Sequence, residues 1–85
     1  MAKNEAEAHH DAVNRFIALA NEMKDEGINI SVVSGSLMTA SGLYASYVAG
    51  GNEGGLTESG VDKVAAVYKR ELERIQKMKK EAAGS

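Results

Sequence analysis

The stretch GINISVVSGSLMTASGLYASYVAGGN, residues 27–52, decides the fold of this chain. It holds no charged residue, although Asp, Glu, Lys and Arg make up 26% of the 85 residues. Apolar residues recur in it at helical spacing, namely Val33, Leu37, Ala40, Tyr44, Tyr47 and Val48. We therefore predict a helix over residues 30–49, capped by Asn29 or Ser31. Because a helix that is polar on no face is covered on every side, we expect protein to surround it.

Two alternatives to this central helix follow from its composition. The β-branched residues and serines are poor helix formers, so a strand over Ile28–Val33 is the first alternative. The second is a transmembrane span, but residues 30–49 contain eight Ser, Thr or Gly, and no aromatic or basic belt flanks them. We therefore predict a helix that does not enter a membrane.

Amphipathic stretches flank the central helix on both sides. The first predicts a helix over residues 6–26, with an apolar stripe of Val13, Phe16, Ile17, Ala20 and Met23. Gly27 followed by Ile28 is typical of a helix that stops at a left-handed glycine. The second predicts a helix over residues 58–81, capped by Thr57 or Ser59, with an apolar stripe of Val61, Val64, Ala65, Tyr68, Leu72, Ile75 and Met78. Glu73 and Lys77 form an i,i+4 ion pair in the favourable order.

Three helices with short connections predict an all-α, antiparallel three-helix bundle. We expect one domain over residues 1–85, with residues 1–5 and 82–85 frayed. The segment GGNEGG, residues 50–55, is expected to be a mobile connector, or else a hinge through which the third helix exchanges between subunits.

Composition excludes several classes of function. The chain has no Cys, which removes disulfides and thiolate chemistry, and its net charge of -2 gives no general attraction to nucleic acid. Its first residues are polar and acidic, where a signal peptide needs a basic and then an apolar segment. We therefore expect a cytoplasmic protein.

No catalytic, cofactor-binding or metal site is predicted. Glu5 and His9 lie four residues apart and could share an ion, but two ligands make a weak site, and a solvated acidic helix start explains them. GGNEGG lacks the Gly-Lys-Ser/Thr of a phosphate-binding loop. No Ser, His and Asp occur at spacings that indicate a nucleophile. We therefore predict that the chain is not an enzyme.

A second face of the central helix carries small residues, namely Gly35, Thr39, Gly42, Ser46 and Ala49. We call this set the small-residue stripe. Small side chains let another helix approach closely, and that helix belongs either to the same chain or to a second copy. We predict a non-enzymatic protein-interaction module, with a homodimer or another protein as the partner of this stripe.

Charge is distributed unevenly along the chain. Residues 1–26 hold three basic and six acidic residues, whereas residues 69–81 hold six Lys or Arg and three Glu. These segments can pair within one chain or across a dimer. The alternative function is a nucleic-acid-associated regulator that uses Arg70, Arg74, Lys77 and Lys80, although interleaved glutamates weaken it. A third hypothesis is a ligand carrier with a pocket among Phe16, Tyr44 and Tyr68.

The run RFIALANE, residues 15–22, is followed after the glycine turn by Val33-Ser34, by LMTAS at residues 37–41 and by Tyr44. This pattern resembles a small uncharacterised bacterial all-helical family, a domain of unknown function, over residues 11–48. The resemblance implies a bacterial cytoplasmic origin and a helical fold. It implies no catalytic residue, and the Gly-rich connector and the basic third helix lie outside it.

Overall fold

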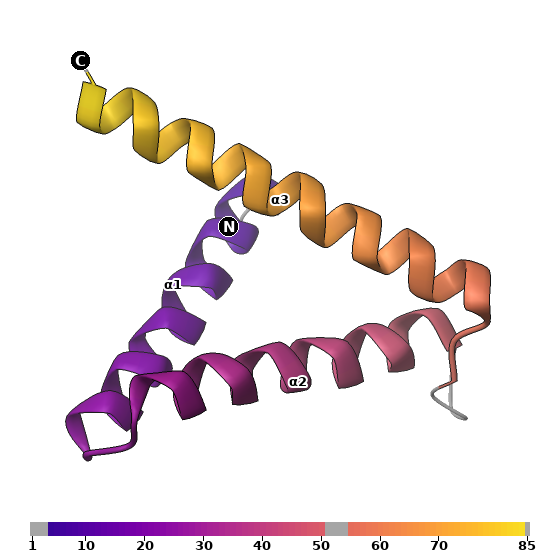
Figure 1. Cartoon of the computed structure of the whole chain (residues 1–85), viewed down its shortest axis with the longest axis horizontal. Coiled ribbons are helices and arrows are strands. Elements are labelled where there is room, and N and C mark those ends of the chain that lie inside the picture. Colours follow the sequence, from indigo (N-terminus) through magenta and orange to yellow (C-terminus); the bar gives the residue numbers. More distant parts are fainter. Residues whose placement is uncertain (1–3, 51–54, 85) are drawn as a thin grey trace. The chain divides into compact units, whose positions relative to one another are not determined.

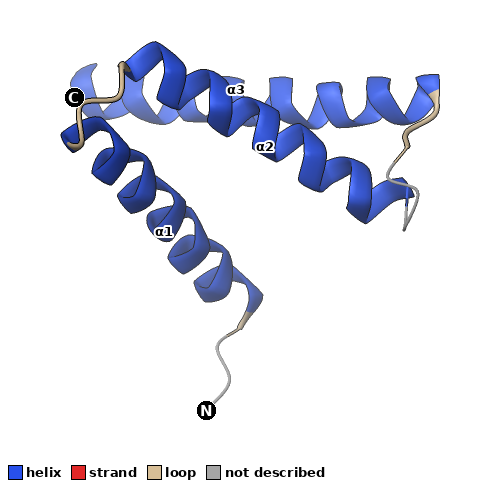
Figure 2. Cartoon of the chain, turned by 90° about the horizontal axis from the view of Figure 1, so that it is seen from below, coloured by secondary structure: helices blue, strands red, loops and turns tan. Residues whose placement is uncertain are grey.

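The computed structural model of the chain describes residues 4–50 and 55–84 (Figure 1). These residues form three α-helices: α1 (Glu5–Asp25), α2 (Ile30–Gly50) and α3 (Glu58–Gly84). No strand occurs in the two described segments, and the alternative of a strand over Ile28–Val33 is wrong because α2 begins at Ile30 (Figure 2). The all-α, three-helix prediction is confirmed, while the antiparallel bundle stays a prediction.

Each helix begins at a polar residue that accepts a backbone N–H. The Asn4 side chain accepts from the Glu7 N–H at 2.8 Å, and that of Asn29 accepts from the Ser31 N–H at 2.8 Å. Thr57 Oγ1 accepts from the Gly60 N–H at 3.1 Å. These bonds satisfy donors that have no partner inside the helix. Asn29 rather than Ser31 caps α2, and Thr57 rather than Ser59 caps α3.

The end of α1 follows the predicted glycine stop. Gly27 has a φ of 97°, and its N–H donates to the Lys24 carbonyl at 3.0 Å. The Ile28 N–H donates to the Met23 carbonyl at 3.1 Å, which completes the paired bonds of a Schellman motif. The turn between α1 and α2 is therefore encoded locally.

The far end of α2 lies against the residue that leads into α3. A Cβ built on Gly50 would lie 2.2 Å from the Gly55 carbonyl oxygen, so the backbones approach too closely for any side chain at residue 50. The expected mobility of GGNEGG falls on residues 51–54, which lie outside the described residues.

The predicted end of α3 is wrong by one turn. The helix continues to Gly84 instead of ending at residue 81, because Ala82 and Ala83 are strong helix formers. Residues 82–84 are therefore helical and not the frayed tail that we expected. Ser85 lies outside the described residues, as do residues 1–3.

The chain divides within α2 into two compact units, Met1–Gly42 and Leu43–Ser85. In the first, α1 and α2 contact each other, and Val33, which is 8% exposed, is the one buried residue. In the second, none of the described residues is buried. Neither unit encloses a hydrophobic core of its own.

Most residues expected to form the core are exposed to solvent. Phe16 is 61% exposed, Tyr44 72% and Val48 75%, and of α2 only Val33 is buried. The expectation that protein surrounds α2 is therefore not met by the described chain. Neither unit by itself buries the rest of the α2 surface.

Candidate functional site: the surface of α2

The small-residue stripe lies along α2. Gly35, Thr39 and Gly42 belong to the first unit, and Ser46 and Ala49 to the second. A spacing of three or four residues sets neighbouring members on one side of a helix. Thr39 Oγ1 donates to the Gly35 carbonyl at 3.1 Å, so this hydroxyl is satisfied within the helix and needs no outside partner.

The stripe offers space for close approach. Apart from the adjoining residues and the nearby backbone of α2 itself, a Cβ built on Gly35 or on Gly42 meets no described atom within 4 Å. Thr39 and Ala49 are exposed, whereas Ser46 is half-buried. A helix with small side chains and accessible backbone along one side can pack at a short interaxial distance.

Three large apolar residues border the stripe, and the sequence analysis did not name them. Val32, Met38 and Leu43 are exposed by 58%, 57% and 60%. Helical spacing could have identified two of them. Val32 lies seven residues before Thr39 and Leu43 lies four residues after it, which sets both beside the stripe. Exposed apolar side chains therefore border the stripe, and they add area for a contact that excludes water.

Apart from Glu26, which follows α1, the charged groups of the described residues lie on α1 and α3. On α3, the Arg74 guanidinium donates to Glu71 Oε1 and to Met78 Sδ. Arg74 forms an ion pair with Glu71 on this helix. The predicted ion pair between Glu73 and Lys77 is not found among the described residues. Arg74, one of the predicted nucleic-acid contacts, is therefore engaged within its own helix.

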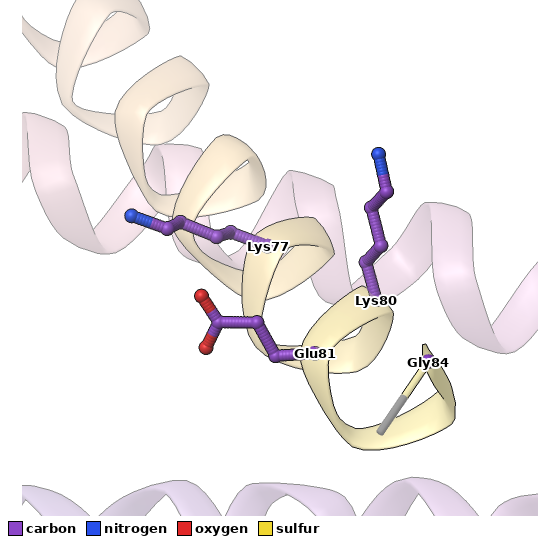
Figure 3. Close-up of a pocket in the computed structure, with 4 residues that line it drawn as sticks. All are labelled: Lys77, Lys80, Glu81 and Gly84. Carbon is purple, nitrogen blue, oxygen red and sulfur yellow. The ribbon is translucent and has the colours of Figure 1, made fainter.

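On the part of the chain that the structure describes, two surface depressions are each lined by a single helix. Lys77, Lys80, Glu81 and Gly84 line one near the end of α3; Lys77 and Glu81 extend to the same side, while Lys80 points away (Figure 3). Ala6, Glu7, His10 and Asp11 line the other, on α1. Residues of one helix supply no second wall, so neither depression encloses a ligand.

The residues predicted for a ligand pocket or for a weak metal site line no enclosed site among the described residues. Phe16, Tyr44 and Tyr68 are all exposed, and none of them lines either depression. Glu5 and His9 are exposed on α1, and the described residues contain no group of three or more His, Cys, Asp or Glu that could hold a metal ion. None of the described helices combines the length and apolar character needed to cross a bilayer.

Comparison with known proteins gives no match to this chain. No family model matches it, and neither the curated proteins nor the solved structures contain a significant match. The resemblance to a bacterial helical family therefore stays a prediction.

Proposed function

We propose that this chain is a small, non-enzymatic helical interaction module that self-associates as a homodimer through α2. One observation carries the proposal: α2 has no charged residue on any side, and Val33 is its one buried residue. Burying a large apolar side chain is worth about 1.5–3 kcal/mol, so an uncharged helix with this much exposed apolar surface favours association.

The uncharged surface of α2 favours a second copy of the same chain as its partner. A three-helix bundle gives its middle helix two neighbours, and the side of α2 away from them still carries only apolar and small residues. A two-fold axis lets one patch meet itself, so a single sequence feature supplies both halves of the contact. Chains of this length gain from such added burial, because one small core supplies only a few kcal/mol.

The proposal is tested by the mass of the protein in solution. We expect light scattering at high protein concentration to give twice the chain mass of 9.0 kDa, with dissociation on dilution. The Cys-free composition and the resemblance to a bacterial helical family lead us to propose a bacterial cytoplasm, a reducing compartment, as its location. A folded monomer at every concentration would contradict self-association.

Nucleic-acid binding by α3 is the second candidate, favoured by the exposed Lys77 and Lys80. Because Glu71 engages Arg74 and further glutamates lie between the cations, we expect no binding to labelled DNA or RNA at about 0.15 M salt. Fluorescence anisotropy measures this directly. Binding that weakens steeply with added salt would support this candidate instead.

A further inference from the structure

One side of α1 begins with an acid, and the apolar stripe of α3 continues into a base. On α1, Glu5 precedes Ala12 by seven residues and so lies on the side that carries His9, Ala12, Phe16, Leu19, Ala20 and Met23. This side shares Phe16, Ala20 and Met23 with the apolar stripe described above. On α3, Lys79 follows Leu72 by seven residues and so continues the side that carries Val61, Val64, Ala65, Tyr68 and Leu72. An acid therefore marks the start of this side of α1, and a base marks the end of the stripe on α3.

These stripes match when the two helices run in opposite directions. If Glu5 is set opposite Lys79, then Phe16 meets Tyr68 and Met23 meets Val61. Small residues then face larger ones in three further pairs, which are Ala12 with Leu72, Leu19 with Ala65, and Ala20 with Val64. Each stripe is about 27 Å long, because 18 residues separate its ends. Phe16, Leu19, Val61, Tyr68 and Leu72 are exposed and available for such a contact.

The overall charge of the two helices favours the same direction. The first half of α1 holds Glu5, Glu7 and Asp11 and no Lys or Arg, whereas residues 69–81 of α3 have a net charge of +3 from six cations and three glutamates. In an up-down-up bundle, α1 and α3 run parallel, which sets the three carboxylates beside the start of α3, where Glu58 and Asp62 lie. Only an antiparallel pair brings the acidic and basic halves together.

In the predicted antiparallel bundle, α1 and α3 of one chain run in the same direction, so this antiparallel pair has to form between copies.

We infer that α1 of one copy packs antiparallel against α3 of a second copy, with Glu5 opposite Lys79. This inference rests on the proposed self-association and names its second surface. A two-fold axis produces the pairing twice per dimer, so each copy gives α1 to one pair and α3 to the other.

Charge reversal tests the register. Glu5→Lys sets two ammonium groups opposite each other in both pairs, and Lys79→Glu sets two carboxylates opposite each other. We expect each variant alone to raise the dissociation constant of the dimer about tenfold or more, measured by sedimentation equilibrium. Mixing the two variants in equal amounts restores an opposite-charge pair at both positions, and we expect association within about threefold of the wild type.

Two matched variants control for effects on the helices themselves. Glu7→Lys removes a first-turn carboxylate and the bond that Glu7 accepts from Asn4, yet it lies off the stripe, and Lys80→Glu is the equivalent change on α3. We expect both to leave the dissociation constant within about threefold of the wild type.

The outcomes separate this inference from the proposed function. A dimer that tolerates Glu5→Lys and Lys79→Glu overturns the register and leaves association through α2 standing. Loss of association that mixing does not restore overturns pairing between copies. A wild-type monomer overturns both proposals.

Discussion

Replacing Gly42 with leucine is expected to weaken self-association by on the order of 100-fold while raising helix content. A larger side chain in a closely packed contact costs about 1–3 kcal/mol, and the two-fold axis applies this cost in both copies. Within the described chain a Cβ at Gly42 meets open space, and leucine favours a helix over glycine by somewhat less than the roughly 0.8–1 kcal/mol that separates glycine from alanine. The helix should therefore become more stable while the affinity between copies falls. Circular dichroism and sedimentation equilibrium measure the two quantities.

Gly84→Leu is the matched control for this change. Gly84 is also helical, and a Cβ built there meets no described atom within 4 Å, but it lies at the end of α3 and outside the small-residue stripe. We expect it to leave the dissociation constant unchanged. If Gly42→Leu associates as tightly as the wild type, the stripe is not a close contact between copies.

Diluting the protein a hundredfold is expected to lower the midpoint of thermal unfolding by roughly 8 °C. Neither unit encloses a core, so folding and association should be linked, and a hundredfold dilution then removes about 2.7 kcal/mol of stability per dimer. Unfolding entropy is about 2.1 cal/mol/K per residue near 60 °C, which for two chains of 85 residues gives this shift. Circular dichroism at 222 nm in cells of different path length measures it.

The Gly42→Leu variant provides a comparison for the dilution experiment. Because its dimer is weaker, its midpoint should lie below that of the wild type at every concentration where the wild type is dimeric. A midpoint that does not move with dilution, together with a mass of 9.0 kDa, would mean that the single chain completes its own core.

Local signals in the sequence predicted the helices well. The predicted bounds of α2, residues 30–49, differ from Ile30–Gly50 by one residue, and Asn29 caps it. These features depend on bonds between residues two to five positions apart, so neighbouring residues are enough to specify them. Of the two caps predicted for α3, Thr57 is the one that accepts a backbone N–H, that of Gly60.

The candidate site was predicted only in part. Spacing identified Gly35, Thr39 and Gly42, whose surroundings are open. It did not draw attention to Val32, Met38 and Leu43, because helical periodicity was used to find two stripes and these residues lie between them. Their place in the candidate site follows from the exposure of their side chains. Exposure depends on every neighbouring segment and cannot be obtained from spacing alone.

The amino-acid order alone determined three helices, the glycine stop at Gly27 and a central helix without charge. Each follows from interactions within one turn or from residue chemistry, which do not depend on distant contacts. Only the tertiary structure decided how little of the apolar surface is enclosed, with Val33 alone buried among the described residues. Burial is a sum over contacts between segments far apart in the chain, and periodicity shows which side chains share a face without showing what covers that face.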